Sequence, residues 1–570
     1  MSVSCKYWVF GMYCLVSLPL FSQSFYLELN LNEPVAQSRF QMSKPKPALE
    51  IFRVIEKAGK DNRINGIILN IGAFSGSREY IWELRNSLEQ FKAKGKKICA
   101  FISSADMDVY NLASVADKIV MDELGTLSMI GYSWGRGYVQ HSLDKLGIGV
   151  RELRYLEYKS AAEMFTRDSM SEADRRQSNE YLDEIFNLTR STLIKARNWT
   201  DEEFNIILNK EFLYSAKSAL ERKLVDRIGR KDAVVEAIRE IEGADVKNFA
   251  LYGDSVSSLM GDNAVYGPPK TGGLFKRPPI IAIVHANGQT DMESGMSAWN
   301  LSQTIRELAD NKRVKAVVVR INSPGGSAEA ADYMAEAISY VKQKKPVVVS
   351  MGGVAASGGY WAAMNASHIS ATPYTVTGSI GVIGSWFYNK SLNEKLGLTI
   401  DTLQRGTHAD LMSGIFLPYR DLTADEEERY KSYIMDIYND FVGRVAKGRG
   451  MDVEKVEAAA QGRIFSGVGA LNAGLIDSIG GLSDAIYTAR ALAGIPEEKN
   501  VSFREFPKPK FLDKLLENFP LLSIFFKGRG SNSKANTLEF FTGMFIPADI
   551  RYRLECNGQA MPILPLDFSH

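Results

Sequence analysis

The sequence has few of the residues that bind metals or form disulfide bonds. It contains four cysteines and five histidines among 570 residues, and they form no cluster with metal-ligand spacing, so no metal is expected. Cys5 and Cys14 fall in an apolar N-terminal stretch, and Cys99 lies in a run typical of a buried strand, which favours a packed free thiol. The formal net charge is only +1, and without a basic excess we expect no nucleic-acid partner.

The N-terminus differs from the rest of the chain. Lys6 precedes an apolar stretch over 7–21, and small and polar residues follow at 22–24. This pattern is typical of a secretory leader, because the apolar run is short for a membrane span. We assign residues 1–24 to a signal peptide or N-terminal membrane anchor, with a buried first helix as the alternative. The residues that follow are expected outside the cytoplasm.

A long internal repeat organises the chain. Residues 65–71 resemble 315–321, an offset of 250, and the same offset carries Ile130-Gly131 onto Ile380-Gly381. One register over such a length indicates a duplicated domain. The region between the copies is rich in glycine and proline, which is typical of a linker. The predicted divisions after the leader are a first domain at 25–262, a linker at 263–279, a second domain at 280–498 and a tail at 499–570.

Each half alternates β-branched runs with helical patterns. In the second half, the predicted strands are 280–284, 316–321 and 347–350, and the predicted helices are 301–309 and 328–342. This alternation predicts an α/β fold with a mostly parallel sheet and packed helices in each half. After residue 495 the pattern stops. Residues 511–526 have apolar side chains at helical spacing, which suits a subunit interface, a membrane surface or packing against the same domain.

A glycine-containing turn stands between a predicted strand and the helix that follows it. It reads Asn-Ser-Pro-Gly-Gly-Ser over 322–327. Gly325 and Gly326 would leave backbone N–H groups free near a helix start, which suits an anion. No Gly-Lys-Ser/Thr follows, so a phosphate-binding loop is disfavoured. We predict an oxyanion hole for a tetrahedral intermediate, with an ordinary tight turn as the alternative.

Two serines are candidate nucleophiles. Ser379 lies in Thr-Gly-Ser-Ile-Gly, and the flanking glycines allow a backbone that exposes its hydroxyl. Ser357 lies in Ala-Ala-Ser-Gly-Gly-Tyr, which resembles the nucleophile segment of Clp-type proteases. Those enzymes place a histidine base farther downstream, where this sequence has none, and His368 is too near. We therefore interpret Ser357 as a small residue that packs a helix on the sheet.

Ser379 needs a base other than histidine, and lysine is a known substitute. In the repeat, Lys159 corresponds to Ala409, whereas Ser379 corresponds to Met129. The separations agree, because 30 residues part 129 from 159 and also 379 from 409. One half has kept the serine and the other the lysine. We predict Ser379 as the nucleophile and Lys159 as general base and acid, with a pKa lowered by burial.

These motifs together resemble a known family. The segments at 158–160, 323–326, 356–360 and 377–381 are similar to those of the signal peptide peptidase A family, also called protease IV, in its long tandem-repeat form. The resemblance reaches from the leader to about residue 495. It implies two tandem Clp/crotonase-like domains, of which the first supplies the lysine and the second the serine.

The resemblance also implies a function. It indicates a membrane-associated serine endopeptidase that degrades signal peptides, and other apolar extended peptides, after their release from exported proteins. It further implies a homo-oligomer, a tetramer, at the bacterial inner membrane with the catalytic domains on the periplasmic side. A serine–lysine dyad requires no cofactor.

Two other classes of function compete with this one. The first is a non-catalytic membrane scaffold that keeps the fold and binds peptides. The second is crotonase-like acyl-thioester chemistry, which the glycine turn would serve equally well. Export argues against the second, because acyl-CoA substrates are cytoplasmic. The scaffold is disfavoured because each half retains the one dyad residue that the other half has lost.

Overall fold

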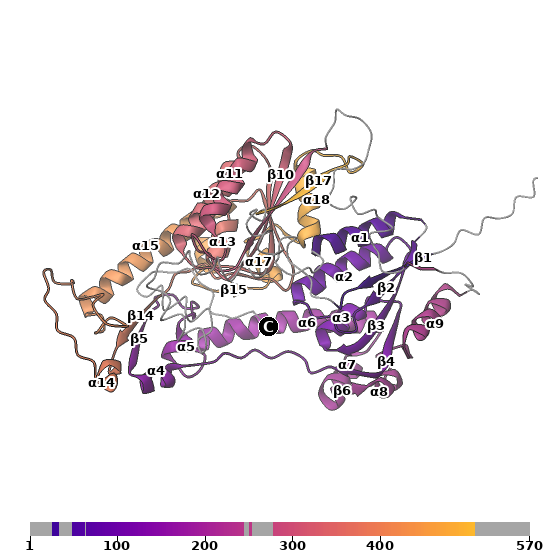
Figure 1. Cartoon of the computed structure of the whole chain (residues 1–570), viewed down its shortest axis with the longest axis horizontal. Helices are drawn as coiled ribbons and strands as arrows, with labels where there is room; N and C mark the ends of the chain where they lie inside the picture. Colours follow the sequence, from indigo (N-terminus) through magenta and orange to yellow (C-terminus); the bar gives the residue numbers. More distant parts are fainter. Residues whose placement is uncertain (1–24, 33–47, 63, 244–249, 253–277, 508–570) are drawn as a thin grey trace, which may run out of the picture.

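The structure is a computed structural model that describes residues 25–32, 48–62, 64–243, 250–252 and 278–507 (Figure 1). The predicted leader at 1–24, nearly all of the predicted linker, and the tail from residue 508, with its amphipathic segment at 511–526, lie outside the described residues. Within the described residues, no helix combines the length and the apolar character needed to cross a bilayer.

The first half is built on a seven-stranded sheet of the described residues. Among the described strands of this sheet, every pair is parallel except β4 with β6. Along β2, Ile67 and Leu69 pack with α1, α2 and α3 on one face, while Ile68 packs with α9 on the other. Side chains that alternate between two apolar faces require helices on both. In sheet order the strands are β6 (Leu213–Ser215), β4 (Lys118–Ser128), β3 (Lys97–Ala105), β2 (Ile64–Asn70), β1 (Phe25–Asn30) and β8 (Ala250–Tyr252), with β7 (Arg227–Ile228) beside β4.

The helices of the first half follow the strands in alternation, as the sequence pattern predicts. They are α1 (Ala48–Lys60), α2 (Arg78–Lys92), α3 (Met107–Ala113), α4 (Gln140–Leu146), α5 (Glu163–Thr166), α6 (Glu172–Arg197), α7 (Asp201–Ile206), the π-helix η1 (Ile207–Glu211), α8 (Ala216–Glu221) and α9 (Lys231–Glu242). Cys99 on β3 is a buried free thiol, which confirms that prediction.

The second half repeats the design with an eight-stranded sheet. Val317 and Val319 of β10 face α11, α12 and α13, and Val318 faces α18. The strands in sheet order are β15 (Ile464–Phe465), β13 (Val376–Gly378), β11 (Val347–Ala356), β10 (Val314–Ser323), β9 (Ile280–Asn287) and β17 (Ser502–Phe506), with β12 (His368–Ala371) beside β11 and β16 (Ser478–Ile479) beside β12. The helices are α11 (Ala298–Asp310), α12 (Ala328–Lys342), α13 (Gly358–Ala363), α14 (Leu392–Leu396), α15 (Ala424–Arg449), α16 (Val453–Ala459), α17 (Gly467–Asn472) and α18 (Leu482–Leu492).

The sequence-based elements of this half are confirmed, with one exception at its end. The predicted strands and helices fall within β9, β10, β11, α11 and α12. The prediction that the pattern stops after residue 495 is wrong for β17, which pairs in parallel with β9. The second sheet therefore extends past the predicted boundary at 498. A five-residue edge strand with charged side chains carries too weak a pattern to be found from sequence.

The two halves interlock through a long excursion of the first. After β4, residues 129–139 form neither helix nor strand and run along the lower edge in Figure 1 to α4. The next strand, β5 (Ile148–Leu153), joins neither large sheet and pairs antiparallel with β14 (Gly384–Asn389) of the second half. The chain then returns along α6, which crosses back toward the first sheet. This excursion places the segment around Lys159 against the second half.

A buried ion pair also joins the halves. Glu83 on α2 lies 2.7 Å from Arg320 on β10, with only 4% and 13% of the two side chains exposed. The Glu83 carboxylate also accepts the Leu482 N–H at 3.1 Å. Burial raises the pKa of Glu83 although Arg320 opposes the shift. The pair is therefore largely buried between the halves.

Glu83→Ala is expected to lower the free energy of unfolding by about 3–5 kcal/mol, because it leaves Arg320 buried without its partner. Denaturant unfolding measures the loss. Arg429→Ala is the matched control, since it breaks an exposed pair with Asp425 worth about 0.5 kcal/mol or less. Equal effects of the two substitutions would contradict the structural role of the Glu83–Arg320 pair.

Candidate active site

Lys159 belongs to the first half but lies against the second. Its side chain is fully buried. Its Nζ lies 2.7 Å from Ser357 Oγ, 3.0 Å from Ser379 Oγ and 2.9 Å from the Ser379 carbonyl oxygen. The structure thus brings together the lysine and the serine that the repeat singled out, within one chain. It also adds a second serine to the same cluster.

A short segment, residues 460–463, lies between the backbone at Lys159 and the backbone at Ser379 and fixes the distance between these two backbones. A Cβ built on Gly462 would lie 2.6 Å from Lys159 Cβ, so the two backbones are in direct contact. Three backbone hydrogen bonds connect this segment to both neighbours: Tyr158 N–H to Gln461 O at 2.9 Å, Gly462 N–H to Ile380 O at 2.8 Å, and Ser379 N–H to Arg463 O at 2.7 Å. The position of the lysine therefore depends on glycine at 462.

Gly462→Ala is expected to reduce both peptidase activity and stability. The residue has a φ of 82°, which costs an alanine about 1–2 kcal/mol, and the new methyl group would push Lys159 away from the serines. Steady-state rates and thermal unfolding measure the two effects. Gly397→Ala is the control, because Gly397 has a φ of 68° but open space around it. If Gly462→Ala kept the activity of the control, the contact with Lys159 would not matter.

Ser357 lies at the sharp turn between β11 and α13. Its φ of 56° and ψ of −115° are rare for a residue with a side chain, and such strain is found at functional sites. A serine on a strained strand-to-helix turn is also the arrangement of a nucleophile elbow. Lys159 Nζ is 2.7 Å from its hydroxyl, so a candidate base lies within reach that the search of the same half did not find. The motif was visible in the sequence, but the lysine beside it comes from the other half, and the role of Ser357 stays a prediction.

Ser379 comes directly after β13, and its hydroxyl is the second one that Lys159 Nζ contacts. It is fully buried and also has a positive φ, 50°. Its carbonyl and its hydroxyl both lie within hydrogen-bond distance of Lys159 Nζ. The structure therefore confirms that Lys159 and Ser379 are neighbours, while the choice of nucleophile stays a prediction.

The glycine turn lies beside Ser357. It follows β10, which is the direct neighbour of β11 in the sheet. A Cβ on Gly359 would lie 2.7 Å from the Ser323 carbonyl oxygen, so the turn packs against the start of α13. Gly325 and Gly326 have φ values of 103° and 155°, and the Gly325 N–H donates to Ser323 Oγ at 3.2 Å. Their role as an oxyanion hole stays a prediction.

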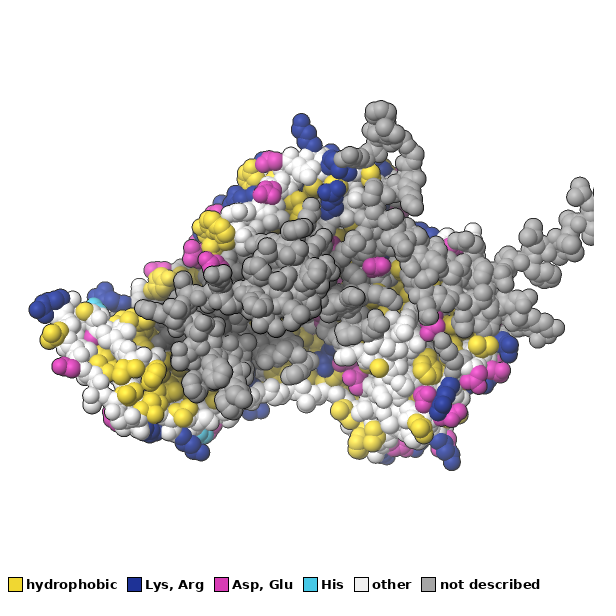
Figure 2. Space-filling model, in the orientation of Figure 1, with side chains coloured by type: hydrophobic (Ala, Val, Ile, Leu, Met, Phe, Trp, Pro, Cys, Tyr) yellow, Lys and Arg dark blue, Asp and Glu magenta, His cyan; other side chains and the backbone are white. Residues whose placement is uncertain are grey.

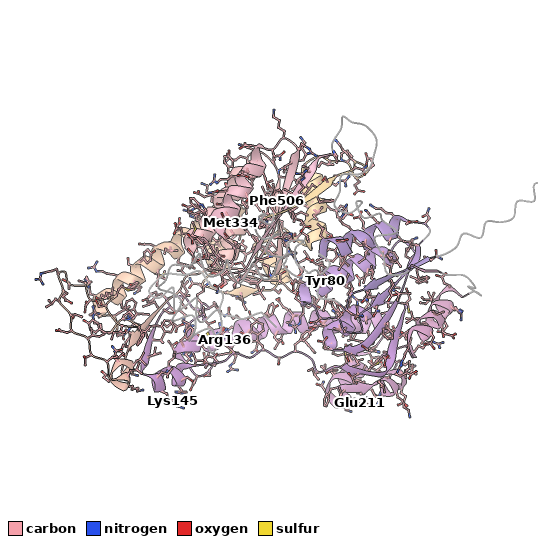
Figure 3. All side chains as sticks on the ribbon, in the orientation of Figure 1. Tyr80, Arg136, Lys145, Glu211, Met334 and Phe506 are labelled. Carbon is pink, nitrogen blue, oxygen red and sulfur yellow. The ribbon has the colours of Figure 1, made fainter. Side chains whose placement is uncertain are left out.

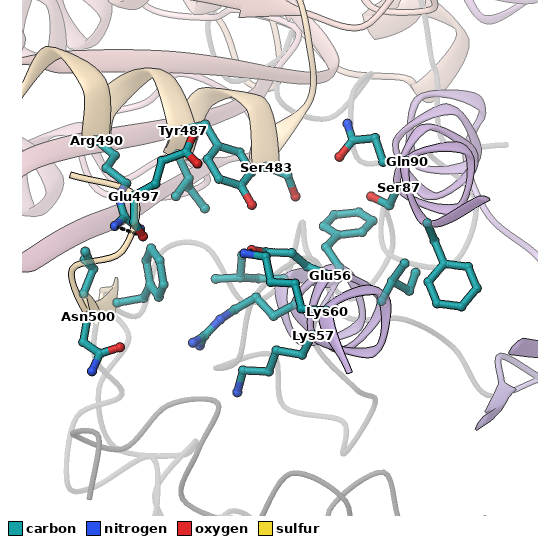
Figure 4. A pocket seen from close by; sticks show the side chains of 18 of the residues that line it. Glu56, Lys57, Lys60, Ser87, Gln90, Ser483, Tyr487, Arg490, Glu497 and Asn500 are labelled. Atoms are coloured by element: carbon teal, nitrogen blue, oxygen red, sulfur yellow. Dashed lines mark hydrogen bonds and ion pairs between the residues drawn. The ribbon is translucent and has the colours of Figure 1, made fainter. Parts of the chain in front are cut away.

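Two cavities lie between the halves, away from this cluster. One, of about 250 Å³, is formed by α1, the end of α2, α18 and residues 497–503, and Figure 4 shows lysine and glutamate side chains of α1 at its wall. The other, of about 210 Å³, lies between α2 and β10. Neither is lined by Lys159, Ser357 or Ser379. Within the described ranges, no group of three or more His, Cys, Asp or Glu side chains could hold a metal ion.

Comparison with known proteins gives the family. Peptidase family S49 matches residues 90–247 and again 339–496, and Clp protease matches residues 286–374. The chain is 32% identical to the chloroplastic serine protease SPPA of Arabidopsis thaliana, over 83% of this chain and 69% of that protein. It is 29% identical to Protease 4 of Haemophilus influenzae, over 83% and 77%. It is 36% identical to a putative signal peptide peptidase SppA of Enterococcus faecium, over 36% and 56%.

A serine peptidase with two tandem Clp-like α/β domains is the class that these matches and the fold define. The chain belongs to peptidase family S49. The resemblance to the protease IV family and the tandem α/β fold, both predicted from the motifs, are thereby confirmed. The starting residues of the two matches, 90 and 339, differ by 249, which agrees with the internal repeat.

Proposed function

We propose that this serine peptidase cleaves peptide bonds with a serine–lysine site in which Lys159 is the general base. The observation that supports it is the position of Lys159 Nζ, within 3.0 Å of two serine hydroxyls. Complete burial removes the water that stabilises an ammonium ion, and this lowers the pKa of a lysine. A neutral lysine at this position can accept a proton from a serine.

The hydrogen-bond geometry favours Ser357 as the serine that attacks. A neutral amine has two N–H donors and one lone pair. The Ser379 carbonyl can only accept, so it takes one N–H, and the other N–H and the lone pair are left for the two hydroxyls. Either hydroxyl could face the lone pair, and the shorter distance, 2.7 Å against 3.0 Å, favours Ser357.

The sheet order supports the same assignment. A nucleophile must reach both its base and the oxyanion donors. Strand β11 lies between β13 and β10, so Ser357 stands between Ser379 with Lys159 on one side and the glycine turn on the other. We therefore propose that Ser357 attacks, that Ser379 holds Lys159, and that the N–H groups of Gly325 and Gly326 stabilise the oxyanion. The competing assignment is the sequence-based one, with Ser379 as the nucleophile.

The reaction then passes through an acyl-enzyme. Two proton transfers precede this intermediate and two follow it. Ser357 Oγ bonds to the scissile carbonyl carbon while Lys159 Nζ takes the hydroxyl proton. The tetrahedral intermediate collapses as the C–N bond breaks, and Lys159 returns the proton to the leaving amine. A water molecule, deprotonated by Lys159, attacks the ester carbon. The ester C–O bond breaks, Ser357 regains its proton, and the new carboxylate leaves.

We propose released signal peptides as the substrates. The motif resemblance supports this class, and so does the name of the Enterococcus relative, a putative signal peptide peptidase. Purified protein is expected to cleave a synthetic apolar signal peptide and to react with a fluorophosphonate, whereas Lys159→Met should do neither. A wild-type chain that binds the peptide without cleaving it would instead support the scaffold function.

The proposed location is the bacterial inner membrane, with the two domains on the periplasmic side. The charged start and apolar run within residues 1–24 support it. A reporter enzyme that is active only in the periplasm, fused after residue 30, is expected to show activity. A reporter that works only in the cytoplasm should stay inactive, and the reverse pattern would contradict this location.

We propose that the chain forms a homo-oligomer, for which the resemblance implies a tetramer. Hydrophobic side chains gather at the end of the molecule that carries β5 and β14 (Figure 2). Leu403, Met412 and Phe416 of this end are 97%, 65% and 58% exposed. Large apolar side chains grouped on a surface mark an interaction site. Light scattering of the purified protein tests the oligomer, and a monomer at micromolar concentration would contradict it.

A further inference from the structure

Gln177, on the first half's long helix α6, bonds to both segments that meet at the serine–lysine cluster. Its side-chain N–H₂ donates to the Tyr158 carbonyl at 3.0 Å, one residue before the lysine. Its side-chain carbonyl accepts the Ile464 N–H at 3.1 Å, one residue after Arg463. Arg463 in turn holds Ser379 through a 2.7 Å backbone hydrogen bond. The side-chain amide of Gln177 thus connects the segment that carries Lys159 to the segment that holds Ser379.

A buried ionic network fixes the orientation of this amide. Gln177 and Asp174 are each only 1% exposed. Asp174 accepts hydrogen bonds from Gln177 at 3.1 Å, from the Ser160 hydroxyl at 2.6 Å, and from Arg136 at 3.2 Å. In Figure 3, Arg136 lies close to α6. Both residues that flank Lys159 are therefore held by α6.

The matching helix of the second half lacks this device. Helices α6 and α15 are both 26 residues long and begin at residues 172 and 424, an offset of 252. Gln177 therefore corresponds to Arg429, which is exposed and pairs with Asp425. The half that has lost the lysine exposes a charged side chain where the half with the lysine buries an amide.

We propose that Gln177 is a positioning residue that sets the register between Lys159 and the serines of the other half. This inference rests on the proposed serine–lysine mechanism. The hydrogen bonds of Gln177 keep the 158–160 segment in place against the 460–466 segment, so that Nζ stays within reach of both hydroxyls. Its loss lets the two segments separate and admits water to Lys159.

The expected change in the pH–rate profile follows from the protonation state of Lys159. The charged side chains around its segment, Asp174 with Arg136 and Glu163 with Arg154, are already paired with each other. Water at Lys159 would stabilise the ammonium form relative to the neutral amine. A smaller fraction of the base is then neutral at a given pH. The rising limb of the pH–rate profile is therefore expected to move to higher pH.

Gln177→Met tests the inference, because it keeps the length of the side chain and removes both hydrogen bonds. We expect kcat to fall by at least tenfold with KM unchanged, together with the shift of the pH–rate profile. Gln177→Glu is the second variant. It keeps the acceptor for the Ile464 N–H and removes the donor to Tyr158, so it should give the same signature if Gln177→Met fails to fold.

Tyr181→Phe is the matched control. Tyr181 lies one turn farther along the same face of α6 and donates to the Tyr374 carbonyl at 2.9 Å, so it crosses the same interface without touching the lysine segment. It should lower stability without moving the pH profile. If both Gln177 variants match Tyr181→Phe in kcat and pH profile, the positioning role is wrong. If wild-type activity does not depend on Lys159, the proposed mechanism itself has failed, which is a separate result.

Discussion

Lys159→Met is expected to abolish peptidase activity and fluorophosphonate labelling while the protein stays folded. General base catalysis contributes about 10²–10⁴-fold, so kcat/KM should fall by about 10³-fold or more. Methionine has nearly the volume of lysine and no charge. Because an apolar side chain of similar volume replaces a buried amine that is costly to remove from water, the free energy of unfolding should change little. Peptide cleavage and thermal unfolding of the same preparations separate the loss of the base from a loss of structure.

A mixing experiment tests whether the site forms within one chain. The structure places Lys159 beside Ser357 and Ser379 of its own chain. Chains with Lys159→Met, mixed and reassembled with chains carrying Ser357→Ala, should therefore stay inactive, since every site lacks one member. Recovered activity would show that the lysine reaches serines of a neighbouring copy.

The internal repeat was enough to single out Lys159, but it did not show where this lysine lies in the fold. Matching Lys159 to Ala409 predicted a pair divided between the halves, and the structure brings the two sides together. Ala409 itself is exposed, so a lysine placed there in the Lys159→Met chain would not replace the buried one. The contact of Lys159 with the second half depends on the excursion from residue 129 to β5, which crosses to that half. No local pattern in the sequence encodes that crossing.

Ser357 shows the opposite case, a residue whose local signal was clear and whose partner was not. The Ala-Ala-Ser-Gly-Gly motif fits a strand-to-helix turn, and the structure has that turn. A search for the base downstream in the same half could not succeed. Gln177 gave no signal of its own, because a glutamine on an amphipathic helix is usually exposed. Its burial follows only from the packing of α6 along the 460–466 segment.

The strands and helices that alternate could be predicted because their apolar residues follow the periods of the elements. Val317, Val318 and Val319 form a continuous apolar run, as expected for a strand covered on both faces. The short elements β15, β16 and β17 have two to five residues and depend on their neighbours for pairing. Strand β15 lies beside the site, and β17 ends the second sheet. The alternating strands and helices were therefore predicted better than the surroundings of Lys159.

Ser357→Ala and Ser379→Ala are expected to differ sharply. Ser357→Ala should remove fluorophosphonate labelling and peptide cleavage, with a loss of about 10³-fold or more, because the attacking oxygen is gone. Ser379→Ala keeps the Ser379 carbonyl that accepts from Lys159 and removes only one hydroxyl from Nζ. It should label more slowly, at a rate reduced by about tenfold. Mass spectrometry of the labelled protein identifies the serine that carries the adduct, and an adduct on Ser379 would establish the competing assignment.

The backbone of Ser357 gives a second test that does not depend on a probe. At a φ of 56° and a ψ of −115°, a side chain is strained and glycine is not. Ser357→Gly should therefore raise the free energy of unfolding by about 1 kcal/mol while it removes activity. Ser357→Ala keeps the strain and serves as the control for stability. A serine that the protein holds in a strained turn at a cost in stability, beside a buried lysine, is what a nucleophile requires. A Ser357→Gly protein that is less stable than Ser357→Ala would show that the turn is not strained, and the argument for Ser357 from its backbone would fall.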